Sequence, residues 1–177
     1  AGVHLQVLRK ECAEAIKFME ERKQVILMVR AQQHQRAAFK LIGTDEEPKH
    51  VSDEELKILA TNNSTMTTYY YQKTYISFIF RSYDDTKYYT EKYLACISNT
   101  WANLLLVHAY HAFYVGLISF WLARKSRDEH QWHERGIKSK LELKKWAESS
   151  RWTFENKWYL LEAEESYYNN DVDATKR

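Results

Sequence analysis

Apolar side chains recur along most of the chain at steps of three and four residues, which is the period of an amphipathic α-helix. Residues 5–41 contain two such stripes, separated by the polar segment 20–24: Leu5, Leu8, Cys12, Ile16 and Met19, and then Ile26, Val29, Ala37 and Leu41. Gly43 follows the second stripe, and glycine is a common residue just after a helix ends. We therefore expect a helix pair between Gly2 and Gly43, followed by a loop over Thr44–His50.

Further helix boundaries follow from capping signals. Ser52 with Glu55, and Ser126 with Glu129, have the spacing of a capping box, in which each side chain accepts a hydrogen bond from the other residue's backbone N–H. The first box predicts a short helix over 53–59, and the second predicts a helix that extends to about Ser149. Three more helices are expected over 82–97, 100–124 and 153–168, with a turn at 169–171 into a last, truncated one.

The segment 70–80 is aromatic and β-branched, a composition that by itself favours a strand. The neighbouring segments read as helices, and no second strand is predicted with which it could pair. We therefore expect a helix here, preceded by a loop and a helix start over 61–68.

Composition supports an all-α fold. The 177 residues include four Gly and one Pro (Pro48), far fewer than a chain built of strands and tight turns needs. Hydrophobic residues make up 45% of the chain, enough for a core, and the length suits one domain over residues 1–177. The net charge of +2 provides no argument for a nucleic-acid or membrane partner.

The expected turns between helix pairs are spaced at 39 to 45 residues, at Gly2, Gly43, Ser82, Lys125 and Asn170. Repeats of this length that each contain two helices are typical of α-solenoids, in which stacked pairs bury apolar faces that one pair could not bury alone. The sequence therefore predicts an α-solenoid of about four helix pairs.

Residues 113–175 carry a set of packing residues that resembles a known family: Phe113-Tyr-Val-Gly-Leu117, Trp132, Gly136, Lys145-Trp146, Phe154, Lys157, Leu160-Leu-Glu-Ala-Glu164 and Asn170-Asp-Val-Asp-Ala174. Residues 2–43 are similar as well, through Leu5, Leu8 and Gln24. The chain resembles the tetratricopeptide-like helical-repeat region of large multidomain signalling ATPases. In that family a protein-kinase-like domain and an AAA-type ATPase precede this region, and a GAF sensor with a histidine-kinase or cyclase output often follows.

The resemblance implies that small residues stand where two helices approach closely, at Gly116 and Ala163. Thr74, Thr86 and Tyr93 replace the small residues expected in the middle of the chain, and Thr175 stands where Ala is usual. The sequence begins without Met and ends in a polar segment, so we expect a fragment of a longer protein. The resemblance places phosphate-binding and kinase residues outside it, and we predict no catalytic or cofactor-binding residue here.

Two features of the chain allow a membrane or a metal as an alternative. Trp101–Ala123 has no charged residue over 23 positions, long enough to span a bilayer, but His108, His111, Asn103 and Ser119 would be costly in lipid. We therefore expect a buried helix, with a membrane span as the alternative.

His108 with His111, and His130 with His133, have spacings that a metal could use. No third ligand is implied, so we expect the first pair to be hydrogen-bonded in the core and the second to line an exposed face.

Basic residues concentrate on one predicted helix that also contains Trp132 and Trp146: Arg135, Lys138, Lys140, Lys144 and Lys145. Glu134, Glu142 and Glu148 alternate with them, which is typical of a solvated face rather than a nucleic-acid surface. The thirteen tyrosines, with a run at 69–71, could line an aromatic groove for a small molecule. We expect instead that they fill wide gaps between helices. Tyr89 and Tyr93 are expected to point inward.

Cys12 and Cys96 both lie in apolar helical patterns, so we expect them to be buried and reduced, and the chain to be cytoplasmic. No spacing of Ser, His, Asp or Cys predicts an active site. The function predicted from the sequence is therefore a non-catalytic region that makes protein–protein or interdomain contacts. A ligand-sensing solenoid and a membrane-associated helical domain are the alternatives.

Overall fold

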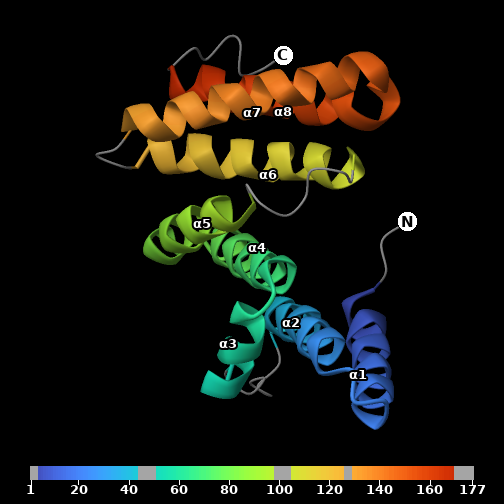
Figure 1. Ribbon diagram of the computed structural model, residues 1–177. Helices are drawn as coiled ribbons and strands as arrows, with labels where there is room; N and C mark the ends of the chain where they lie inside the picture. Colours follow the sequence, from blue (N-terminus) through green and yellow to red (C-terminus); the bar gives the residue numbers. More distant parts are fainter. Residues whose placement is uncertain (1–3, 44–50, 98–104, 126–128, 170–177) are drawn as a thin grey trace. The chain divides into compact units, whose positions relative to one another are not determined.

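The computed structural model describes residues 4–43, 51–97, 105–125 and 129–169 (Figure 1). The secondary structure within these ranges is entirely helical, as the sequence predicted: α1 (Leu5–Glu21), α2 (Val25–Ile42), α3 (Asp53–Ala60), α4 (Asn63–Ile79), α5 (Tyr83–Ile97), α6 (Leu105–Ala123), α7 (Glu129–Ser149) and α8 (Arg151–Tyr168). Residues 70–79, whose composition suits a strand, lie inside α4. The predicted loop with Pro48, the helix start at Thr100, the Ser126 capping box and the turn after Asn169 fall outside the described residues.

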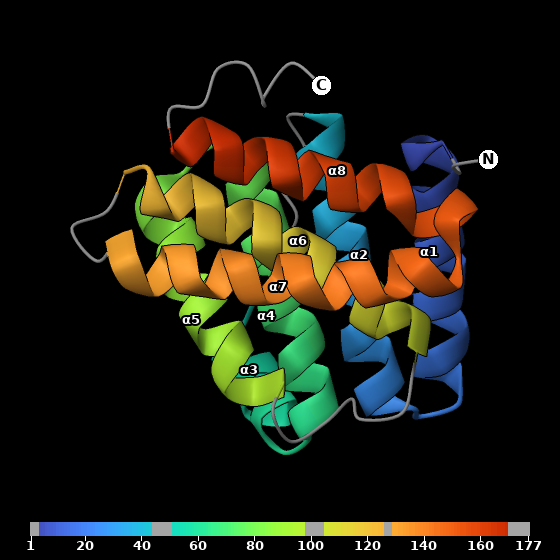
Figure 2. The ribbon, with the colours of Figure 1, turned by 90° about the horizontal axis from the view of Figure 1, so that it is seen from above.

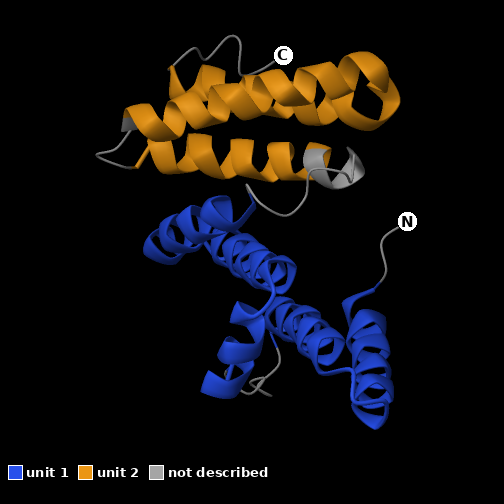
Figure 3. Ribbon diagram, in the orientation of Figure 1, with its two compact units in different colours: residues 1–100 blue, residues 101–177 orange. Residues whose placement is uncertain are grey.

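The chain divides into two compact units, residues 1–100 and residues 101–177 (Figure 3). The first contains α1 to α5, and the second contains α6 to α8. The expectation of one helical-repeat domain over residues 1–177 stays a prediction.

In the first unit, the α1–α2 hairpin and the α4–α5 hairpin have turns of the same backbone conformation. Lys23 and Arg81 have left-handed backbone angles, with φ of 55° and 58°, and each stands two residues before the next helix. The N–H of Ser82 then donates to the carbonyl of Ser77 at 3.0 Å, which closes the α4 terminus. Such a turn usually contains glycine, because an L-residue in this conformation costs about 1–2 kcal/mol. The 39- to 45-residue spacing placed Ser82 between two helix pairs, whereas Ser82 lies in the turn between α4 and α5, which pack together.

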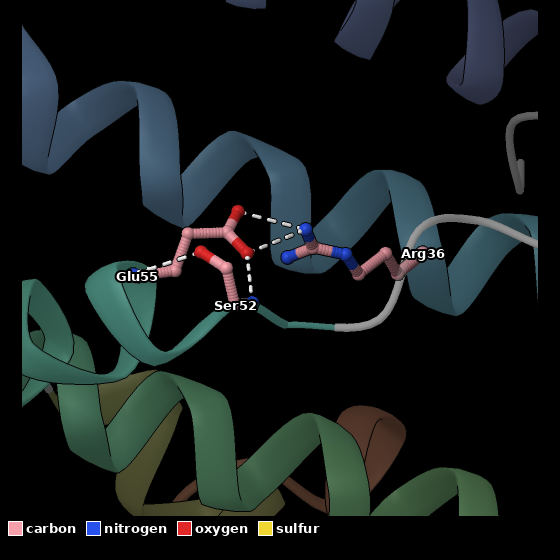
Figure 4. Close-up of polar contacts among 3 residues, drawn as sticks. All are labelled: Arg36, Ser52 and Glu55. Carbon is pink, nitrogen blue, oxygen red and sulfur yellow. Dashed lines mark hydrogen bonds and ion pairs between the residues drawn. The ribbon is translucent and has the colours of Figure 1, made fainter.

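The Ser52–Glu55 capping box is present and has a third member (Figure 4). The Glu55 N–H donates to Ser52 Oγ at 3.2 Å, and the Ser52 N–H donates to Glu55 Oε2 at 2.7 Å. Arg36 of α2 donates from Nη2 to both oxygens of the same carboxylate, at 2.7 and 3.0 Å. One carboxylate therefore begins α3 and attaches it to α2.

The α4–α5 hairpin buries an unusually polar set of side chains: Thr65, Thr67, Thr68, Thr74, Ser77, Thr86, Thr90 and Tyr93. Thr90 Oγ1 donates to the Thr86 carbonyl and Thr86 Oγ1 donates to the Ser82 carbonyl, both at 2.6 Å. A threonine bonded back onto its own helix has its hydroxyl satisfied, so it can pack in a buried position. Thr74, Thr86 and Tyr93, which replace the small residues expected from the resemblance, are all buried.

The second unit is a bundle in which α6, α7 and α8 all pack on one another (Figures 1 and 2). Its core contains Ala109, Phe120, Leu143, Ala147, Phe154 and Leu161. The close approach expected at Gly116 is present: a Cβ there would lie 2.7 and 2.9 Å from the Leu161 methyl carbons and 3.2 Å from Ser139 Cβ. Gly136 is equally crowded, with a Cβ 2.7 to 2.9 Å from three atoms of the Phe120 ring. Two glycines therefore set the spacing of the three helices.

Candidate functional site

A surface groove of about 730 Å³ runs along α7, and every described residue that lines it belongs to this helix. The lining residues follow each other at steps of three and four, so they share one face: Glu134, Ile137, Lys138, Leu141, Glu142, Lys145, Trp146 and Ser149. We refer to this set as the α7 groove.

The opposite side of α7 fixes how the helix is rotated. Leu143 is fully buried and Ala147 is 5% exposed, both in the core of the bundle. The Lys140 ammonium pairs with the Glu165 carboxylate of α8, which ties one flank of α7 to its neighbour. Because these contacts hold one face inward, the groove face points away from the core.

The apolar residues of the α7 groove lie at its two sides, Ile137 and Leu141 on one and Trp146 on the other. Leu141 is 52% exposed, and Ile137 and Trp146 are half-buried. The Trp146 ring packs against Phe154 with centroids 6.0 Å apart, so the core holds this side chain in place. Ile137 also packs against the core, and Leu141 lies one helical turn after it, so these two side chains form an apolar flank of the outward face.

Charges of both signs occupy the middle of this face: Glu134 and Glu142, Lys138 and Lys145. Protein–protein interfaces combine apolar residues with surrounding polar and charged ones. In the sequence, the same alternating charges are typical of a solvated face. The step of four between Ile137 and Leu141, beside these charges, is the signal that could have identified the groove.

The predicted basic cluster does not form one surface. Arg135 lies over the Trp132 ring at 5.4 Å, Lys144 lies over the Trp158 ring at 5.6 Å, and Lys140 pairs with Glu165. Trp132 is only 3% exposed, so its ring is not open to stack on a base. Of the five basic residues, only Lys138 and Lys145 line the groove.

The two histidines of α7 lie in different surroundings. His130 Nε2 lies 3.1 Å from Glu134 Oε1 at the surface, as expected for an exposed face. His133 instead stacks on the Tyr168 ring at 4.2 Å between centroids, so its placement on an exposed face was wrong. The cause is the packing of α8 across this part of α7. Among the described residues, no three potential metal ligands come together, and the side chain of His108 lies outside them.

The tyrosines of α4 and α5 pack mainly on one another. Tyr71 stacks on Tyr75 with centroids 6.4 Å apart and contacts Tyr93 at 5.6 Å. Tyr93 is 4% exposed, which confirms its inward direction, and Tyr89 is half-buried. These contacts favour the packing role. A small-molecule groove lined by these rings stays a prediction.

Lys73 of α4 is held among these rings, with its ammonium 5.8 Å from the Tyr69 centroid and 6.0 Å from that of Tyr89. Burial, followed by the nearby Arg36 guanidinium, lowers the pKa of Lys73. Burial and the neighbouring tyrosines raise the pKa of Tyr69 to about 12. Both shifts favour the neutral forms, as expected in a partly desolvated site.

The two cysteines are both free thiols. Cys12 is buried as expected, whereas Cys96 is only partly buried, which corrects the expectation for that residue. Burial raises the pKa of both thiols, so neither is a thiolate of the kind that acts as a nucleophile at neutral pH.

Within the described ranges, none of the helices has the combined length and apolar character that crossing a bilayer requires.

No protein-family model, curated protein or solved structure matches the chain. The relation to signalling ATPases therefore rests on the residues named above and stays a prediction. The geometry of the α7 groove carries the functional argument.

Proposed function

We propose that this chain is a non-catalytic helical-repeat region that acts as a scaffold or regulatory element through protein–protein or interdomain contacts. By its resemblance, it serves a multidomain signalling ATPase or kinase. The observation that carries this proposal is the α7 groove, in which a half-exposed leucine lies beside charges of both signs.

The groove suits a helix better than a small molecule. It is open along one face of a single helix, and Ile137 and Leu141 on its apolar flank lie one helical turn apart. A helix that docks on such a face presents its own apolar residues at steps of three and four. The neighbouring charges would then determine the orientation of the partner rather than most of the affinity.

Features of the packing support the helical-repeat part of the proposal. Gly116 lets α6, α7 and α8 approach closely, which is the role that the resemblance implies for a small residue at this position. Stacked repeats also leave faces that only the next element of the stack covers. A tetratricopeptide-like solenoid of about four helix pairs is the architecture that we propose on this basis.

Site-specific photo-crosslinking tests the proposal. A benzophenone amino acid is placed at Leu141 in the full-length protein and irradiated in its native cells. The matched control has the same label at Tyr159 of α8, which is 53% exposed against 52% for Leu141. We expect a discrete polypeptide adduct at position 141, either to another chain or to another part of the same chain, and several-fold less of it at position 159.

The adduct must also depend on the groove. Replacing Lys145 by Glu should lower its yield, because Lys145 lines the groove one helical turn after Leu141. Equal labelling at both positions, no adduct at 141, or an adduct that is insensitive to Lys145→Glu would each overturn the proposal.

A further inference from the structure

The charges that line the α7 groove form an alternating series along the helix: Glu134, Lys138, Glu142 and Lys145. When the helix is reversed about its middle, close to residues 139–140, a positive residue takes the place of each negative one and a negative residue takes the place of each positive one. Reversal brings Glu134 to the place of Lys145 and Lys138 to the place of Glu142. It also exchanges the two apolar residues on one flank, Ile137 and Leu141.

A two-fold axis perpendicular to a helix performs this same reversal. In an isologous contact, each residue of one copy meets its counterpart under the axis on the other copy. Two antiparallel α7 helices in this register would therefore place each glutamate opposite a lysine. The Leu141 of each copy would pack beside the Ile137 of the other.

Building on the proposed function, we infer that the occupant of the α7 groove is the α7 helix of a second copy of this chain, bound antiparallel about a two-fold axis near residues 139–140. A parallel pairing would set each charge opposite itself, Lys138 against Lys138 and Glu142 against Glu142, and like charges across a contact oppose binding. The antiparallel pairing removes every one of these repulsions.

Charged and apolar residues contribute differently to this contact. Exposed ion pairs are worth little individually, because solvent and salt screen them. The affinity therefore comes from burying Leu141 and the exposed side of Ile137, while the charges select the antiparallel register. The ion pair that Glu134 makes with His130 is well exposed, with 87% and 66% of the His130 and Glu134 side chains accessible, so Glu134 can exchange partners.

Sedimentation velocity of the purified chain over a range of concentrations tests the inference. We expect a reversible transition between the 21.2 kDa monomer and a species of twice that mass. Glu142→Lys places a second cation opposite Lys138 at two positions in each dimer, and it should weaken association by about tenfold or more. Lys138→Glu should weaken it similarly, because it places a second carboxylate opposite Glu142.

The double variant K138E/E142K reverses both charges and restores every opposite-charge pair, so its association should return to within about threefold of the original. Only a contact in which both residues occur on both sides predicts this recovery. Glu91→Lys is the control, because Glu91 is exposed on α5 and does not line the groove. These variants change only charged side chains, none of which is buried, and circular dichroism verifies that they keep their helices.

A chain that stays monomeric at every concentration would overturn the inference, and so would a dimer that ignores Glu142→Lys or that the double variant does not restore. The proposed function is tested separately by the crosslink at Leu141. An adduct there to a different polypeptide would leave the docking role intact and refute the second copy as the occupant.

Discussion

Replacing Gly136 by Ala tests the packing that holds α7 against α6. The added Cβ would lie 2.7 Å from Cε1 and 2.9 Å from both Cδ1 and Cζ of Phe120. Carbon atoms in favourable contact are about 3.5–4.0 Å apart, so the methyl group overlaps the ring by about 0.6 Å or more. Phe120 is fully buried, and its ring has no exposed direction in which to move.

Two opposing terms determine the result. Overpacking of a buried contact typically costs about 1–3 kcal/mol. Alanine in place of glycine within a helix contributes about 1 kcal/mol of stability. Because the contact is with a rigid ring rather than a flexible chain end, we expect the upper part of the first range. The free energy of unfolding should therefore fall by about 1–2 kcal/mol, or roughly 2–8 °C in Tm for a chain of this size.

Urea unfolding followed by tryptophan fluorescence measures the change, with Phe120→Leu as the second arm of a double-mutant cycle. The smaller side chain makes room for the methyl group, so Gly136→Ala should be neutral or stabilising in the Phe120→Leu background. The two substitutions should show a coupling energy of about 1 kcal/mol or more. If Gly136→Ala stabilises the original chain by about 1 kcal/mol, helix propensity acts unopposed and the packing argument is refuted.

Three further substitutions test local features of the first unit. Thr74→Val should raise the free energy of unfolding by about 1 kcal/mol, because Thr74 Oγ1 is buried without a hydrogen-bond partner. Thr90→Val is the control, because the Thr90 hydroxyl donates to the Thr86 carbonyl, and it should gain less stability in the same urea titration. Ser52→Ala should lower the free energy of unfolding by about 1 kcal/mol because α3 loses its cap, and an unchanged urea midpoint would contradict this. Tyr69 has its pKa raised to about 12 by burial, so the folded chain keeps a proton that the unfolded chain loses above pH 10. Stability should therefore fall between pH 10 and 12, and Tyr69→Phe should make that fall shallower in unfolding curves measured across this range.

The turns show where sequence and structure separate. Gly43 was predicted to end α2 because glycine readily adopts a left-handed conformation, and its φ is 70°. Lys23 and Arg81 adopt the same conformation without any such signal. Lys23 and Arg81 lie in the turns of the α1–α2 and α4–α5 hairpins, and packing between the two helices of each hairpin offsets the cost of this conformation. A local sequence pattern does not reveal that packing.

The sequence by itself determined that the chain is helical and where most of its helices begin and end. Periodicity, caps and breakers act within about four residues, so they can be read locally. The tertiary structure alone decided which residues meet across helices: Arg36 on the Glu55 carboxylate, His133 on Tyr168, and Phe120 against Gly136. It also decided that the Leu141 face of α7 points outward, because the rotation of a helix depends on which neighbours bury its other faces. Those neighbours lie far away along the chain, and only the folded packing brings them together.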